Sequence, residues 1–140
     1  EIRYRDHFDI ARPRTLQEFT IPDAISRAAC SMANEINAKA IVVITHSGFS
    51  AINLAKYRPK ALILAVTGRE KILRRLNLVW GIRGIVVPDF VAETDTAFQR
   101  INEELRNLKY VQSGDYVIYT VGLPLLSRGT TNSIKIEKVA

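Results

Sequence analysis

Cysteine, histidine, methionine and tryptophan are scarce in this sequence, and their scarcity narrows the possible sites. In 140 residues there are one cysteine, one methionine, one tryptophan and two histidines. The single cysteine, Cys30, cannot form an internal disulfide, and its alanine-rich helical surroundings indicate a small buried residue. We expect no metal site and no catalytic residue. The acids Asp89, Glu93 and Asp95 fall at a loop and a helix start, where they favour the helix dipole.

Long hydrophobic runs are also missing. No apolar stretch approaches the ~20 residues that a membrane helix needs, and the opening EIRYRDHFDIARPR is too charged for a signal peptide. With the single cysteine, this favours a cytoplasmic protein without a membrane partner. The net charge is +6, but the basic residues are spread along the chain without a nucleic-acid-binding motif. We therefore expect solvated faces that attract phosphorylated metabolites and no nucleic-acid partner.

The apolar residues that are present alternate between strand and helix patterns. Continuous β-branched runs predict strands at 40–44, 61–66, 85–87 and 116–121, with Gly81 and Gly84 bracketing a bend before the third. Helical spacing predicts helices at 20–36, 49–57 and 94–108, and a short helix with Ile72, Leu73 and Leu76 that follows the second strand. The first begins with Thr20 as N-cap and Asp23 at the capping-box position. Its apolar stripe comprises Ile21, Ala24, Ile25, Ala28, Ala29, Met32, Ala33 and Ile36.

The last segment, 133–139, alternates apolar and polar residues, as an edge strand with one solvated face does. The loop before it is too short for a parallel crossover, so this strand must run antiparallel. The order of elements predicts one α/β domain at 20–140, a three-layer α/β/α sandwich with a mainly parallel sheet. Residues 1–19 are expected to form a leader or linker.

Two loops carry the residues expected to bind a ligand. The first follows the 40–44 strand and contains Thr45, His46, Ser47, Gly48, Phe49 and Ser50. The second, 122–131, contains Gly122, Arg128, Gly129 and Thr130. If the fourth strand lies beside the first on the side away from the second, both loops sit where the strand order reverses, which is where open α/β sheets bind ligands. Amides at a helix start, hydroxyls and a cation suit a phosphorylated small molecule. The alternative is that Thr45 or Ser47 merely caps a helix and Gly48 relieves a turn.

Five blocks of the sequence, in order, resemble one family. AKAIVVITHSGFSA, KYRPKALILAVT, LNLVWGI, SGDYVIYTVGLP and GTTNSIKI are similar to the C-terminal domain of pyruvate kinase of the bacterial type, over about 20–139. The resemblance implies a five-stranded mixed sheet of order 3-2-1-4-5 with strand 5 antiparallel. It implies a non-catalytic domain that binds a sugar phosphate or nucleotide monophosphate as allosteric effector and contacts identical subunits or the catalytic domain.

The resemblance also assigns roles to the two loops. The effector phosphate would be held at Thr45, Ser47, Gly48 and Ser50, with 122–131 folding over it, while His46 and Phe49 replace more basic or polar residues of many relatives. The phosphoryl transfer from phosphoenolpyruvate to ADP, with its Mg²⁺ and K⁺, is expected only in an upstream catalytic barrel, so this chain alone is expected to have no enzyme activity and no cofactor.

Three other functions stay open at this stage. The chain is a purely structural assembly module if its alanine-rich first helix docks a partner. It is a small enzyme if His46 acts as a general base. It is a nucleic-acid-binding protein if its positive charge outweighs the absence of a motif.

Overall fold

The computed structural model describes residues 20–87, 94–125 and 131–140. The expected leader, 1–19, lies outside this part of the chain. The elements, in order, are α2 (Ile21–Glu35), β1 (Ala40–Ile44), α3 (Phe49–Ala55), β2 (Leu62–Thr67), α4 (Glu70–Leu76), β3 (Ile82–Val86), α5 (Thr94–Asn107), β4 (Tyr116–Val121) and β5 (Ser133–Lys138). Most bounds agree with the sequence patterns to within a residue or two. Among these elements, no helix is long and apolar enough to cross a membrane.

The five strands form one sheet of order β3-β2-β1-β4-β5. β1 pairs in parallel with β2 on one side and with β4 on the other, and β2 pairs in parallel with β3. β5 runs antiparallel to β4, from Val121 opposite Ser133 to Tyr116 opposite Lys138. This confirms the expected topology. The strand order reverses between β1 and β4, so the loops that follow these two strands meet at the same edge.

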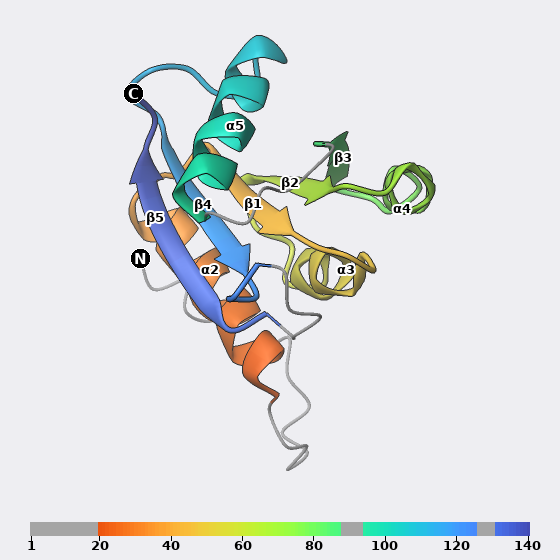
Figure 1. The fold of residues 1–140 in the computed structure, drawn as a ribbon. Helices are drawn as coiled ribbons and strands as arrows, with labels where there is room; N and C mark the ends of the chain where they lie inside the picture. Colours follow the sequence, from red (N-terminus) through yellow and green to blue (C-terminus); the bar gives the residue numbers. More distant parts are fainter. Residues whose placement is uncertain (1–19, 88–93, 126–130) are drawn as a thin grey trace.

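Helices cover both faces of the sheet, which gives three layers (Figure 1). On one face, α2, α3 and α4 bury small and aliphatic side chains such as Cys30, Leu54 and Leu76 against Ile41 and Val43 of β1. On the other face, α5 buries residues that include Phe98, Ile101 and Leu105 against β1, β2 and β4. β1 is buried along its whole length, as its unbroken apolar run predicts. Burial raises the pKa of the Cys30 thiol to about 12, so it stays protonated at neutral pH.

The buried face of α2 differs from the expected stripe. Ser26, Ala29, Cys30 and Ala33 are buried, whereas Ile21, Ala24 and Ala28 are exposed. The helix is apolar over a wide arc, and the sequence pattern alone did not show which part of the arc would face the sheet. The start of the helix is as expected, because the Thr20 hydroxyl accepts from the Asp23 amide at 3.3 Å.

The expectation that Gly81 and Gly84 bracket a bend before β3 is also partly wrong. Gly84 lies inside β3, which begins at Ile82. A Cβ on Gly84 would lie only 2.4 Å from Leu73 Cδ1. The glycine therefore serves the close approach of α4 to the edge of the sheet. The Gly84 amide, at that edge, donates to Asn77 Oδ1 at 2.9 Å.

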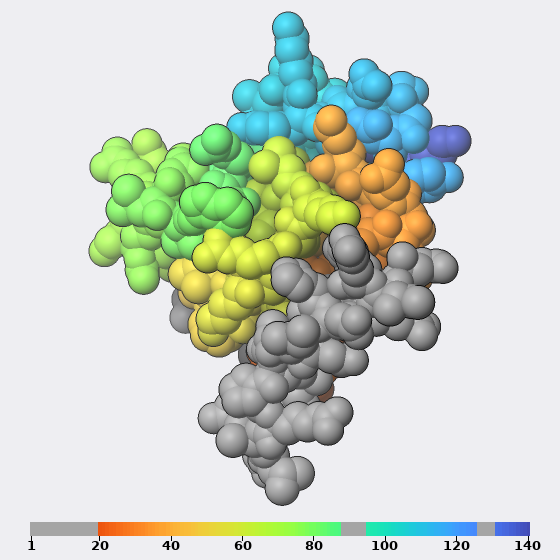
Figure 2. Space-filling model, turned by 180° about the vertical axis from the view of Figure 1, so that it is seen from behind, coloured from red at the N-terminus to blue at the C-terminus, as the bar shows by residue number. Residues whose placement is uncertain are grey.

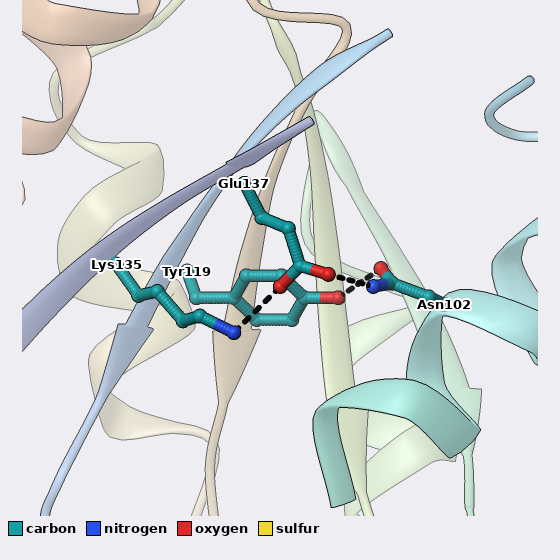
Figure 3. A network of polar contacts seen from close by, with 4 residues as sticks. All are labelled: Asn102, Tyr119, Lys135 and Glu137. Carbon is teal, nitrogen blue, oxygen red and sulfur yellow. Dashed lines mark hydrogen bonds and ion pairs between the residues drawn. The ribbon is translucent and has the colours of Figure 1, made fainter. Parts of the chain in front are cut away.

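A polar network ties α5 to the last two strands (Figure 3). The Tyr119 hydroxyl donates to Asn102 Oδ1, and Asn102 Nδ2 donates to Glu137 Oε1 at 2.6 Å. Lys135 Nζ completes the chain by contacting Glu137 Oε2 at 2.7 Å, and it also lies 4.2 Å from the Phe98 ring centroid. Tyr119 is fully buried. Burial, and then the nearby Glu137 carboxylate, raise the pKa of this phenol.

Candidate functional site

The loop after β1 is shaped by its own hydroxyls and by one glycine. Thr45 is buried, and its Oγ1 accepts from the Gly48 amide at 2.9 Å. Ser47 Oγ accepts from the Phe49 amide at 3.3 Å. The N-cap of α3 is Gly48 itself, in the left-handed region with φ 86°. Thr45 and Ser47 therefore stabilise the turn that leads into the helix, and neither occupies the capping position that the simpler interpretation gave them.

Gly48 suits its position through its close packing as well as through its backbone angle. A Cβ at this position would lie 3.0 Å from Leu76 Cδ2 of α4. The loop thus packs directly on the neighbouring helix. In the first turn of α3 the amides of Ser50 and Ala51 have no acceptor within the described part of the chain. These two donors lie where amides at a helix start bind anions.

The second loop is held closed at its base by Asn132. The Asn132 carboxamide accepts from the Leu123 amide and donates to the Leu123 carbonyl, both at 2.9 Å. The Asn132 amide also donates to the Val121 carbonyl at 3.1 Å, one residue pair beyond the β4–β5 ladder. The side chain therefore extends the pairing of the two strands into the loop and fixes where the loop begins and ends.

The two loops touch each other at two points. Ser50 Oγ and Thr131 Oγ1 are 2.6 Å apart, and Thr131 is buried. His46 Nε2 lies 3.4 Å from the Leu125 carbonyl oxygen. The expectation that these loops meet at the reversal of the strand order is therefore correct.

The structure describes only some of the residues that were expected to form the site. Thr45 to Ser50 and Gly122 lie in the described loops, with His46, Ser47 and Phe49 exposed. Arg128, Gly129 and Thr130 fall outside the described residues. Two residues of this junction, Thr131 and Asn132, were not among the expected site residues. The signal that could have found them is the hydroxyl–amide pair directly before a strand, a pattern typical of turns with side-chain to backbone hydrogen bonds.

Asn53 links the first loop to α2. This buried residue of α3 donates through Nδ2 to Asp23 Oδ1 at 2.9 Å and lies 3.4 Å from Ser26 Oγ. Asp23 Oδ2 accepts from the Thr20 hydroxyl at 2.7 Å. These hydrogen bonds, from Thr20 first and then Asn53, hold the pKa of Asp23 below its ordinary value. The start of α3, and with it the loop, is thereby anchored to the start of α2.

The segment of the sequence that contains the first loop is basic overall. Between residues 36 and 88 there are nine lysines and arginines, and the only acid is Glu70. In the described ranges no three histidine, cysteine or acidic side chains come together as metal ligands would. The loop offers hydroxyls and helix-start amides, and such groups can bind a phosphoryl group.

Comparison with known proteins agrees with this fold. The family model for the pyruvate kinase alpha/beta domain matches residues 23–137. The pyruvate kinase of Clostridium acetobutylicum is 36% identical over 139 residues, which are 99% of this chain and 29% of that protein. The pyruvate kinase of Geobacillus stearothermophilus is 38% identical over 136 residues, or 96% of this chain and 23% of that protein.

Solved structures show the same likeness. A crystal structure of pyruvate kinase from Cryptosporidium parvum superposes with a TM-score of 0.79 at 25% identity, over 94% of this chain and 25% of that one. A second, in complex with ADP, gives a TM-score of 0.80 over 96% of this chain and 26% of that one. The chain thus spans less than a third of the length of these relatives. Fold, block order and family model agree, and the chain belongs to the pyruvate kinase family, in which it corresponds to the C-terminal α/β domain.

Proposed function

We propose that this domain binds a phosphorylated small molecule, a sugar phosphate or a nucleotide monophosphate, between the loop 45–50 and the loop 122–131. In this role it is the allosteric effector domain of a pyruvate kinase, whose phosphoryl transfer from phosphoenolpyruvate to ADP belongs to a catalytic barrel with its own Mg²⁺ and K⁺. The contact between Ser50 and Thr131 carries the proposal, because it brings hydroxyls of both loops to one point.

Three features support a phosphoryl group as the ligand. The hydrogen bond between the Ser50 and Thr131 hydroxyls uses one of their two hydrogens and leaves one for a ligand, and the Ser50 and Ala51 amides have no acceptor in the described chain. The sequence segment 36–88, which contains the first loop, has Glu70 as its one acid. His46 and Phe49 of the first loop are exposed to solvent, and they can contact the part of an effector beyond its phosphate. A phosphate would take the place of water on these donors and gain charge-assisted hydrogen bonds.

Calorimetric titration with fructose 1,6-bisphosphate, ribose 5-phosphate, glucose 6-phosphate and AMP tests the proposal. We expect at least one to bind, and we expect Ser50→Ala to weaken that binding about tenfold, because a hydrogen bond to a charged group contributes about 1.5–3 kcal/mol. Ser113→Ala is the matched control, since Ser113 is an exposed serine of the α5–β4 turn. Failure of all four compounds to bind a folded protein would contradict effector binding.

A role in assembly is the second candidate function, and the exposed face of α2 favours it. Ile21 is 64% exposed, and Ala24 and Ala28 on the same side of the helix are exposed too. Small side chains on an exposed helix let a second helix approach closely. We expect the domain to dimerise in sedimentation and Ala28→Lys to disrupt the dimer. Gln99→Lys adds the same charge on exposed α5 and should leave sedimentation unchanged. A monomeric wild-type chain, or an Ala28→Lys variant that still dimerises, would contradict this role.

A further inference from the structure

The turn between α4 and β3 exposes two large apolar side chains to solvent. Leu78 is 88% and Trp80 74% exposed, more than any other large hydrophobic residue in the described part of the chain. Both line an open groove of about 420 Å³ whose floor includes Leu62 and Ile82. The groove lies at the amino end of β3, whereas the loops 45–50 and 122–131 follow the carboxyl ends of β1 and β4. Exposed apolar groups beside a groove are typical of an interaction surface.

This turn is held in a defined conformation. Leu78 and Val79 donate backbone hydrogen bonds to the carbonyls of Arg75 and Leu76 at 3.2 and 2.9 Å. Asn77 accepts from the Gly84 amide of β3. The Arg58 guanidinium carbon lies 4.3 Å from the centroid of the Trp80 ring, which orients the indole. The two apolar side chains are therefore presented by an ordered turn, and docking onto them costs little ordering entropy.

The charge around the groove has one sign. Arg83 lines the groove and Arg58 contacts Trp80. Arg75 is exposed, and its carbonyl accepts from the Leu78 amide at the start of the turn. All three belong to the segment 36–88, which holds nine basic residues and one acid. In Figure 2 the green segment around residue 80 lies next to the yellow-green segment around residue 60, in agreement with the contact of Arg58 with Trp80. A partner that covers Leu78 and Trp80 must therefore bring negative charge to the rim.

We infer that the Leu78–Trp80 surface, with Arg58, Arg75 and Arg83 at its rim, docks an acidic protein segment that carries an apolar anchor side chain. A second copy of this chain fits less well, because the remaining described ranges hold seven acids and six bases and so carry almost no net negative charge. A nucleic acid would use the basic rim and the indole, but it would leave Leu78 without a partner. This surface is separate from the proposed phosphate pocket.

Trp80 makes the test direct, because it is the only tryptophan of the chain and its fluorescence reports on this surface alone. The probes are a short peptide of alternating Glu and Leu, a matched peptide of alternating Glu and Ser, and oligothymidylate of equal charge. We expect the Glu/Leu peptide to shift Trp80 emission to the blue and to bind at least about tenfold more tightly than the Glu/Ser peptide, because it buries a leucine. Added salt should weaken this binding.

Surface variants locate the contact without endangering the fold. Leu78→Ser should weaken the Glu/Leu peptide about tenfold, and Arg83→Ser should reduce the salt dependence of binding. Ile136→Ser and Lys138→Ser, on the opposite edge strand β5, are the matched apolar and charged controls and should change nothing. The inference is overturned by equal binding of the two peptides, by tighter binding of oligothymidylate, by no change in Trp80 emission, or by a dimer in sedimentation that Leu78→Ser dissociates.

Discussion

At the scale of the residue, Gly48 decides the shape of the loop after β1. Its φ of 86° costs a residue with a side chain about 1–2 kcal/mol, and its missing Cβ leaves room for Leu76 Cδ2. Both features come from tertiary structure. The sequence showed a glycine at a turn, and it did not show that α4 would pack against it.

Gly48→Ala should destabilise the domain more than Gly81→Ala does. Gly81 has nearly the same φ, 84°, but no atom lies within 4 Å of its hypothetical Cβ. Gly81→Ala therefore isolates the backbone strain of about 1–2 kcal/mol, and Gly48→Ala adds an overpacking cost of about 1 kcal/mol or more. Urea unfolding measures both. Equal losses of stability would mean that the contact with Leu76 is not tight.

Asp23 should contribute stability that depends on pH. Its pKa is lowered in the folded state by Thr20 and Asn53, so the stabilisation is present above the pKa of the unfolded chain. It is lost as the pH falls through the folded value. Asp23→Asn should therefore lower the free energy of unfolding at neutral pH, and the gap to wild type should close in acid. Glu103→Gln, at an exposed position of α5, should show a smaller difference at neutral pH. A gap that stays constant with pH would contradict the assigned hydrogen bonds.

At the scale of the element, α5 is joined to β5 through Asn102, which receives the Tyr119 hydroxyl and donates to Glu137 (Figure 3). Because β5 follows the loop 122–131, this network ties the strand that leaves the loop to the helix on the other face of the sheet. Only Tyr119 of this network is buried, and the other three members are half-buried; together their contacts hold the strand against the helix.

Tyr119→Phe tests the network by removing one hydroxyl. We expect a loss of about 1–2 kcal/mol of stability, because Asn102 Oδ1 is left without its donor. Tyr116→Phe removes a hydroxyl from the exposed start of the same strand, where Tyr116 is 42% exposed, and should cost less than about 0.5 kcal/mol. If the two variants unfold at the same denaturant concentration, the Tyr119 hydroxyl does not stabilise the attachment of α5.

The elements themselves followed from the sequence better than their contacts did. Buried strands such as β1 and β4 are continuous β-branched and aromatic runs, so local pattern and burial agree. The expected start of β3 at residue 85 lies three residues after its actual start at Ile82. Arg83 and Gly84 interrupt the apolar run in the sequence, and an edge strand does not need a continuous run. The face of α2 was assigned correctly only in part, because alanine is compatible with burial and with exposure: Ala29 and Ala33 of the expected stripe are buried, whereas Ala24 and Ala28 are exposed.

At the scale of the whole molecule, the two proposed sites occupy opposite ends of the strands. The carboxyl ends of β1 and β4 bring together the loops that we propose bind a phosphoryl group, and the amino end of β3 carries the apolar surface of Leu78 and Trp80. The meeting of the two loops was predictable, because it depends only on strand order and connection length. The contacts of Thr131 with Ser50 and of Asn132 with Leu123 were not, because they depend on side-chain geometry at the junction of two loops.

The central claim is that the two loops form one phosphate-binding site. Backbone amide NMR during a titration with inorganic phosphate, the group common to all candidate effectors, tests it most directly. We predict that Gly48 and Ser50 of the first loop and Thr131 and Asn132 of the second shift together along one binding curve, and that Ser50→Ala weakens the response of both loops. Shifts confined to one loop, or concentrated at the basic surface around Trp80 and Arg83, would contradict the account.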